Sequence, residues 1–254
     1  MNIFSLHTHT IYSDGEDTAE DMILTAIDLG LSRIGITDHS FVHFDAPYCM
    51  AYEKYPAYKQ ELAYLKEKFK GQIEILTGIE QDFYSDYPAE GFDYVIGSVH
   101  YVKLEDEYVA IDWGGETGTK LIRDAADKYF GGDVYAVLER YFETVSNVVE
   151  KTRADIIGHF DVITKSNESH PFFDPEHPRY RAAWKKAADR LLTTGKIFEI
   201  NVSPVLSGAL SVPHPAPEII DHLRKNGAKL IYTGDCHSTD RLRMFAEFMR
   251  QIDR

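Results

Sequence analysis

The run Tyr94-Val95-Ile96-Gly97-Ser98-Val99 is short, apolar and rich in β-branched residues, and it ends directly before His100. Such a composition is typical of a buried strand. Similar runs recur along the chain and alternate with longer segments that carry apolar residues at helical spacing; the other runs cover 2–6, 33–37, 73–79, 155–158, 197–202 and 229–233. This alternation predicts parallel βαβ units rather than a sandwich or a helical bundle.

The segments between these runs are predicted to be helices. Thr18 followed by Asp21 is typical of a helix cap, and Gly30 ends the helical segment 18–29. The other predicted helices cover 52–70, 134–152, 178–194, 215–226 and 240–252. Because 103–133 is longer than one connection requires, we expect an extra helix there, near 120–130, and a flap around Trp113, Gly114 and Gly115. With no linker or repeat, residues 1–254 are most simply one α/β barrel domain, a fold that needs about 250 residues.

Composition limits the class of protein. The chain is 44% hydrophobic and 27% charged, which favours a globular fold. Its formal net charge of -14 disfavours a nucleic-acid partner, which normally requires a basic stripe. No apolar run approaches the roughly 20 residues that span a bilayer, and Met1 has no signal-type flank, so we expect a cytoplasmic protein without a membrane partner. Cys49 and Cys236 are too few for a disulfide framework and are expected to be reduced.

Residue types that bind metals fall at one kind of position, the end of a predicted strand. They follow six of the seven predicted strands: His7 and His9, His39, Glu80, His100, His159, and Asp235 and His237. In an α/β barrel the carboxyl ends of the strands converge on one rim, so these side chains can meet although they are far apart in sequence. His7 and His9 are two residues apart on an extended segment and therefore share a side.

Imidazole and carboxylate groups suit zinc, manganese, iron or cobalt, and this set exceeds the needs of one tetrahedral ion. We therefore expect two or three divalent ions. Such a centre can supply hydroxide at neutral pH and screen the charge of a phosphoryl group, so that no protein nucleophile is needed.

A lone histidine near a strand end is usually a hydrogen-bonded polar residue, but recurrence at six strands favours ligands. Four other histidines lack this placement and are expected at the surface or in loops: His170, His177, His214 and His222. Cys236 lies between two predicted ligands, yet its opposite side-chain direction predicts a packed thiol rather than a nucleophile.

These motifs together resemble the polymerase and histidinol phosphatase (PHP) superfamily. The shared motifs are His7-Thr8-His9, Ser13-Asp14-Gly15, Thr37-Asp38-His39, Gly78-Ile79-Glu80, Gly97-Ser98-Val99-His100, Gly158-His159 and Gly234-Asp235-Cys236-His237. Within that superfamily, three segments look like the histidinol-phosphate phosphatase branch: 92–100, 111–113 and 141–143. The resemblance spans nearly the whole chain and implies a distorted seven-stranded (β/α)7 barrel.

The resemblance also implies a trinuclear centre and its ligands. One metal would take His7, His9, Glu80 and Asp235; a second would take Glu80, His100 and His159; the third would take Asp14, His39 and His237. Glu80 would then bridge two ions as a catalytic residue. Many members of the superfamily have histidine where this chain has Asp14, which implies a preference of the third site for harder ions such as manganese or iron.

Substrate contacts are expected after His159 and in the loop after Asn201. Basic residues would meet the phosphate, but Phe160 and Thr164 are not basic, whereas Lys165 is. The predicted substrate contacts are His43, Lys165, Asn201 and Ser203. Asp161 or a metal-bound water would protonate the leaving alkoxide, and Asp161 or Asp45 would provide a rim carboxylate that is not a ligand.

The leading functional hypothesis is hydrolysis of L-histidinol phosphate to L-histidinol and phosphate, in histidine biosynthesis, by attack of a metal-bridging hydroxide. One alternative keeps the metal centre but changes the substrate to a nucleotide, a sugar phosphate or phosphotyrosine. A second is a barrel amidohydrolase, although the sequence offers no clear bridging lysine, and a third is a non-catalytic metal-binding subunit. The expected partner in the leading hypothesis is a small phosphate monoester.

Overall fold

A single parallel sheet organises the protein, whose structure is a computed structural model that describes residues 3–252. Its strands are β1 (Phe4–Ser5), β2 (Arg33–Ile36), β3 (Glu74–Asp82), β4 (Tyr94–Ser98), β7 (Ile156–Ile157), β8 (Ile197–Asn201) and β9 (Lys229–Thr233), adjacent in that order. All neighbouring pairs are parallel. The seven predicted strands are confirmed within ±3 residues at their ends, except that Asn2 lies outside the described residues.

The two outer strands of this sheet approach each other at their carboxyl ends. Thr8, beyond β1, forms a parallel bridge with Cys236, beyond β9. His9 N donates to Cys236 O at 2.9 Å, and Cys236 N donates to His7 O at 3.1 Å. The sheet is therefore nearly closed, and the predicted distorted seven-stranded barrel is confirmed.

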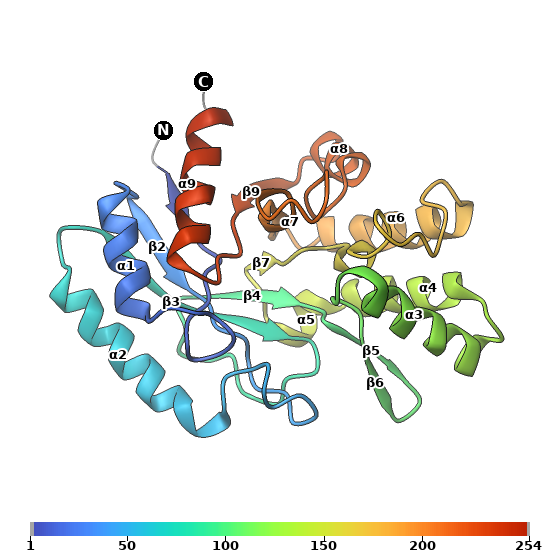
Figure 1. Ribbon diagram of the computed structural model, residues 1–254, viewed down its shortest axis with the longest axis horizontal. Helices are drawn as coiled ribbons and strands as arrows, with labels where there is room; N and C mark the ends of the chain where they lie inside the picture. The colour runs from blue at the N-terminus through green and yellow to red at the C-terminus, as the bar shows by residue number, and fades with distance from the viewer. Residues whose placement is uncertain (1–2, 253–254) are drawn as a thin grey trace.

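Helices cover the outside of the sheet (Figure 1). They are α1 (Ala19–Asp28), α2 (Tyr55–Lys68), α3 (Gly115–Phe130), α4 (Val134–Val145), α5 (Val148–Thr152), α6 (Pro178–Leu192), α7 (Ser203–Leu206), α8 (Pro217–Lys225) and α9 (Thr239–Ile252), with 3-10 turns η1 (Tyr52–Lys54) and η2 (Val162–Thr164). Thr18 caps α1 as predicted, because its side chain accepts from Asp21 N while the Asp21 carboxylate accepts from Thr18 N. Across residues 3–252, no helix combines the length and apolarity needed to cross a membrane.

The hairpin β5 (Tyr101–Leu104) and β6 (Glu107–Ala110) was not predicted from the sequence. Its two-residue connection, Glu105 and Asp106, places Glu105 at φ 52° without a glycine, so the usual hairpin signal is absent. The predicted extra helix is confirmed as α3, which begins earlier than expected, at Gly115 inside the predicted flap.

The single helix predicted over 134–152 is wrong, since it is split into α4 and α5. Ser146 Oγ and Asn147 Nδ2 both donate to Glu143 O, at 2.8 and 2.7 Å. These side-chain bonds compete with the helical backbone pattern and end α4 there.

Close packing of α5 against β4 positions the end of that strand. A Cβ on Gly97 would lie 2.5 Å from Thr152 Oγ1, so only glycine fits at this position. The buried side chains Val148 and Ile157 belong to the same large hydrophobic core. His100, which follows β4, is therefore held on a rigid part of the fold.

Candidate metal centre

All nine side chains predicted as metal ligands lie together at the carboxyl-terminal rim of the barrel. They are His7, His9, Asp14, His39, Glu80, His100, His159, Asp235 and His237. Six of the nine are buried with at most 5% exposure: His7, His9, His39, Glu80, His100 and His159. Glu80 lies within β3, two residues before its end, and not after the strand as predicted.

The first group of donors surrounds His7 and His9. His9 Nε2 lies 3.1 Å from Asp235 Oδ1 and 3.5 Å from Glu80 Oε2. His7 Nε2 lies 3.3 Å from Glu80 Oε2 and 3.6 Å from Asp235 Oδ1. Two imidazoles and two carboxylates thus converge from β1, β3 and β9.

The second group lies on the other side of Glu80. Its Oε1 atom is 2.9 Å from His159 Nε2 and 3.3 Å from His100 Nε2, and those two imidazole nitrogens are 3.2 Å apart. Because Glu80 Oε2 faces the first group and Oε1 faces the second, its carboxylate lies where a bridging ligand would lie.

The third group contains Asp14, His39 and His237. Asp14 Oδ1 is 3.6 Å from His39 Nε2, and Asp14 Oδ2 is 3.3 Å from His237 Nε2. The groups overlap more than the sequence suggested, since His9 Nδ1 is 3.7 Å from Asp14 Oδ1 and His39 Nδ1 is 2.8 Å from Glu80 Oε2.

Unpartnered polar atoms test whether metal ions fit these residues. Among residues 3–252, nine buried side-chain nitrogen and oxygen atoms lack a hydrogen-bond partner, and six of these belong to the cluster: His7 Nε2, His9 Nδ1 and Nε2, Glu80 Oε2, His159 Nδ1 and Asp235 Oδ1. A buried polar atom without a partner costs about 1–3 kcal/mol. Coordination to cations would satisfy the four of these atoms that face the first donor group: His7 Nε2, His9 Nε2, Glu80 Oε2 and Asp235 Oδ1. The mixture of imidazole and carboxylate is the one that borderline divalent ions prefer. The residues therefore fit divalent metals.

Burial and neighbouring charges shift the pKa of several side chains toward the protonation state that binds metals. Burial disfavours the charged form of Glu80, but the neighbouring His39, His7 and His100 hold its pKa well below the usual range. Burial, with His237 and His39 nearby, lowers the pKa of His9 to about 3. Glu80 is thus ionised and His9 neutral at pH 7, the forms that bind metals.

Two further carboxylates, of Glu199 and Asp82, hold predicted ligands, and a third, of Asp38, holds the loop before Asp14. Sequence reasoning did not identify these roles. Glu199 Oε1 accepts from His7 Nδ1 at 2.5 Å, and its Oε2 accepts from His159 N at 2.6 Å. Asp82 Oδ2 lies 3.1 Å from His100 Nδ1. Asp38 accepts from Thr10 N and Oγ1 at 2.8 Å each, and burial raises its pKa to about 6. An acidic residue inside the apolar run 197–202 was the one available signal for Glu199.

Two adjoining cavities open at the cluster. The larger, of about 290 Å³, is lined by Lys165, Asn201, Ser203, His214 and Arg241 together with cluster residues. The smaller, of about 140 Å³, is lined by Tyr48, Asp112 and Lys165 together with cluster residues. Lys165 lines both cavities, and Ser203 lines the larger one.

The remaining predicted substrate contacts, His43 and Asn201, do not both lie at the cavities with free side chains. The His43 side chain is 57% exposed, pairs with Asp86 and lines neither cavity. Asn201 lines the larger cavity, but its Nδ2 donates to Asp235 Oδ2 at 3.0 Å and its Oδ1 accepts from Ser203 N, so it holds a predicted ligand. Asp45 accepts from the Tyr101 hydroxyl at 2.8 Å.

Asp161 is not free to protonate a leaving group or to form the acidic rim, so those expectations are wrong. It is fully buried, its Oδ1 lies 2.8 Å from His214 Nδ1 and its Oδ2 accepts from Ala216 N at 2.8 Å. His214 lies in a loop, as one of the two predicted placements has it, but not at the surface, since it is only 4% exposed. Cys236 is a packed thiol as predicted, because it is fully buried and burial raises its pKa.

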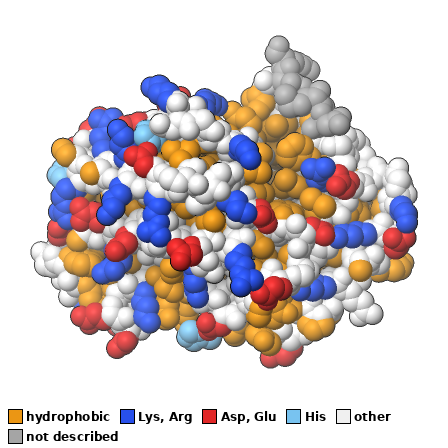
Figure 2. Space-filling view, turned by 180° about the vertical axis from the view of Figure 1, so that it is seen from behind, with side chains coloured by type: hydrophobic (Ala, Val, Ile, Leu, Met, Phe, Trp, Pro, Cys, Tyr) orange, Lys and Arg blue, Asp and Glu red, His pale blue; other side chains and the backbone are white. Residues whose placement is uncertain are grey.

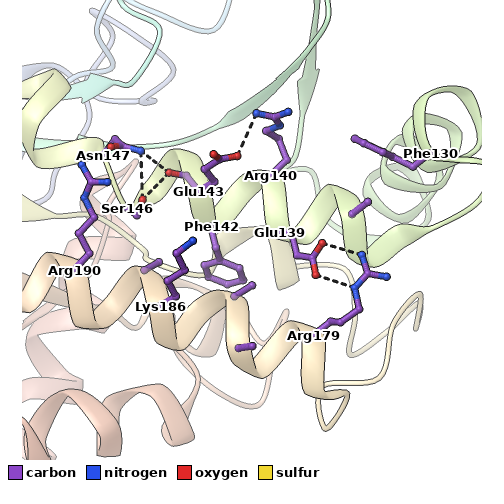
Figure 3. Close-up of a pocket in the computed structure, with 14 residues that line it drawn as sticks. Phe130, Glu139, Arg140, Phe142, Glu143, Ser146, Asn147, Arg179, Lys186 and Arg190 are labelled. Carbon is purple, nitrogen blue, oxygen red and sulfur yellow. Dashed lines mark hydrogen bonds and ion pairs between the residues drawn. The ribbon is translucent and has the colours of Figure 1, made fainter.

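A third cavity, larger than these two, lies away from the cluster, between α4 and α6, with a volume of about 640 Å³ (Figure 3). Four of its charged side chains pair with one another: Arg179 bonds both oxygens of Glu139 at 2.8 Å, and Arg140 bonds Glu143 at 3.2 Å. No predicted ligand lines it. We place the functional site at the barrel rim, where polar atoms are unpartnered.

A nearly closed parallel barrel with a rim of histidines and carboxylates defines the class: barrel proteins that bind divalent metals at the strand ends. The chain belongs to the PHP domain family, whose model matches residues 5–203. A "probable histidinol-phosphatase" of Deinococcus radiodurans is 25% identical, with 97% of this chain and 91% of that protein covered. The histidinol-phosphatase of Bacillus subtilis is 26% identical over 68% of this chain and 71% of that protein.

Solved structures share the fold. A protein of Listeria monocytogenes superposes with a TM-score of 0.79 at 18% identity, covering 94% of this chain and 97% of that one. The histidinol phosphate phosphatase of Lactococcus lactis, in complex with zinc, L-histidinol and phosphate, superposes with a TM-score of 0.65 at 21% identity, covering 98% and 92%.

Proposed function

We propose that this protein is a metal-dependent phosphatase that hydrolyses L-histidinol phosphate to L-histidinol and phosphate. The observation that carries the proposal is the convergence of nine imidazole and carboxylate side chains, six of whose buried atoms lack partners, beside a cavity large enough for a small molecule. The relatives that are named histidinol-phosphatases support the choice of substrate.

The three donor groups would hold two or three divalent ions, with Glu80 between the first and the second. Zinc in the Lactococcus lactis complex supports zinc as one of them, and manganese, iron and cobalt also suit these donors. When bound, such ions lower the pKa of water to about 7 and neutralise phosphoryl charge.

The protein's own residues would orient the site. Glu199 fixes His7 with its proton on Nδ1, because an ionised carboxylate only accepts, so Nε2 is left for a metal. Asn201 holds Asp235 in place. Lys165, which faces both cavities, is placed to attract a phosphoryl group by its charge.

Asp112 replaces Asp161 and Asp45 as our candidate for the carboxylate that binds a cationic group of the substrate. It lines the smaller cavity beside Tyr48, and it belongs to none of the three donor groups. An ammonium group there would form a charge-assisted hydrogen bond, which contributes roughly 1.5–3 kcal/mol. L-Histidinol phosphate carries such a group.

We further propose that residues 1–254 form one domain, that the protein works in the cytoplasm, and that it has no nucleic-acid partner. The family match and the shared sheet support the first point, since β8 lies within the matched residues and β9 pairs with it. Basic and acidic side chains are interspersed on the face in Figure 2, which supports the last.

The test is a substrate panel with the purified protein loaded with manganese or with zinc. Phosphate monoesters, including L-histidinol phosphate, nucleotides and phosphotyrosine, are compared with diesters and amides. We expect the highest kcat/KM with L-histidinol phosphate. A preference for another monoester would indicate a different PHP phosphoesterase, preferential amide hydrolysis would indicate an amidohydrolase, and no turnover with bound metal would indicate a non-catalytic subunit.

A further inference from the structure

His214 is anchored beside the metal centre by its backbone. Asn201 N donates to His214 O at 2.7 Å, and His214 N donates to Asn201 O at 3.0 Å. This antiparallel bridge ties the segment before α8 to the end of β8. Asn201 also bonds the predicted ligand Asp235, so a single residue, Asn201, connects His214 to the cluster.

The His214 ring is fixed by Asp161. Nδ1 lies 2.8 Å from Asp161 Oδ1, while Asp161 Oδ2 is held by Ala216 N. The two side chains are 5% and 0% exposed. Because an ionised carboxylate only accepts hydrogen bonds, the proton is assigned to Nδ1. In the neutral ring, Nε2 is then an acceptor with a defined direction.

No described residue satisfies that acceptor. His214 Nε2 is one of the three buried unpartnered atoms outside the predicted ligands, with Gln81 Oε1 and Trp184 Nε1. Of these three residues, only His214 lines a cavity at the metal centre. Buried polar groups are rarely left without a partner, so this nitrogen calls for a donor from a ligand.

The cavity limits the kind of donor. It has a volume of about 290 Å³ and is also lined by Lys165 and Arg241. Their positive charges disfavour a positively charged ligand group at His214. A neutral N–H group meets the acceptor without that repulsion. An imidazole attached to the leaving alcohol has such a group.

We propose that His214, oriented by Asp161, is a specificity-determining residue whose Nε2 accepts a hydrogen bond from a neutral heteroaromatic N–H group in the leaving alcohol. The inference rests on the proposed function and assigns the 290 Å³ cavity to the leaving group. Asp161 is then a positioning residue and not an acid.

Three phosphate esters test this assignment in the metal-loaded protein: L-histidinol phosphate, n-butyl phosphate and p-nitrophenyl phosphate. We expect His214→Ala to lower kcat/KM at least tenfold for L-histidinol phosphate, mainly through KM, and less than threefold for the other two esters, which lack an N–H group. Calorimetry with L-histidinol should give a dissociation constant at least tenfold weaker in the variant.

The matched control is His222→Ala, which removes another histidine paired with an aspartate, Asp189, outside both cavities. It should leave all four measurements within twofold. His214→Gln keeps a hydrogen-bond acceptor in its side chain. It should therefore lose less kcat/KM for L-histidinol phosphate than His214→Ala does.

Three results would overturn the proposal. An equal loss with n-butyl phosphate but not with p-nitrophenyl phosphate would mean that His214 acts on the departing oxygen. An equal loss with all three esters would mean a structural role, and no loss with any would mean that a water satisfies Nε2. If the wild type binds L-histidinol through His214 but does not hydrolyse its phosphate, the proposed function fails while the contact stands.

Discussion

At the scale of single residues, Glu80 is a buried carboxylate between two of the donor groups. It is 1% exposed, and each of its carboxylate oxygens lies within 3.5 Å of imidazole nitrogens from a different donor group. Burial of a carboxylate is costly unless cations or donors surround it, and here the histidines keep it ionised. Loss of its charge should therefore affect both neighbouring groups.

We predict that Glu80→Gln lowers kcat by more than the roughly 10- to 100-fold that loss of an outer-shell partner costs. The amide cannot neutralise two cations, so metal content should fall too. Steady-state kinetics and elemental analysis measure the two effects. The control is Glu74→Gln, on the same strand but exposed and paired only with Arg33. Near-normal turnover of Glu80→Gln would remove the bridge assignment.

Asp14, in contrast to the buried Glu80, lies at the open edge of the cluster with a side chain that is 29% exposed. We predict that Asp14→Ala loses one metal ion and retains the others, because Asp14 belongs only to the third group. Elemental analysis of matched preparations measures this, with Asp28→Ala, at the exposed end of α1, as the control. Loss of every ion in a folded variant, or of none, would contradict a separable third site.

At the scale of elements, β8 supports the centre although it supplies no predicted ligand. Glu199 and Asn201 are two residues apart on this strand and therefore point to the same side. Glu199 bonds His7 and His159, and Asn201 bonds Asp235. The strand without a predicted ligand at its end thus orients ligands that follow three other strands, β1, β7 and β9.

We predict that Glu199→Gln lowers metal affinity about 10- to 100-fold, since an amide holds the His7 tautomer less firmly than a carboxylate. Competition with a chromogenic chelator measures the affinity. Glu116→Gln, an exposed change in the first turn of α3, serves as the control. Unchanged metal affinity would show that His7 does not depend on this contact.

At the scale of the whole molecule, the two cavities adjoin the metal-binding rim, and we propose that together they determine substrate choice. We predict that kcat/KM for L-histidinol phosphate exceeds that for p-nitrophenyl phosphate at least a hundredfold. p-Nitrophenol is the better leaving group, so the reversal needs about 2.7 kcal/mol of contacts made to the histidinol portion in the transition state. Asp112 and His214 are placed to provide them.

Parallel assays with both esters under the same metal loading measure this ratio. Asp112→Asn should reduce it, while Asp86→Asn, an exposed change near His43, should not. Comparable efficiency with the two esters would leave a general phosphoesterase.

The sequence alone determined where the seven strands lie along the chain and which metal-binding residue types lie near their ends. Periodicity and β-branched runs are local properties, so 33–37 and 229–233 could be recognised as strands without knowledge of their partners. In a parallel barrel all strand ends share one rim, and this rule was enough to bring His7, His100 and Asp235 together.

Only the tertiary structure decided how the side chains behind and beside the ligands are used. Asp161 and His214 are 53 residues apart, and nothing local indicates that they pair in the core. Glu199 likewise depends on a contact with His7 across 192 residues. Burial, hydrogen-bond partners and cavity walls arise from elements distant in the chain, so these roles follow from packing and not from sequence pattern.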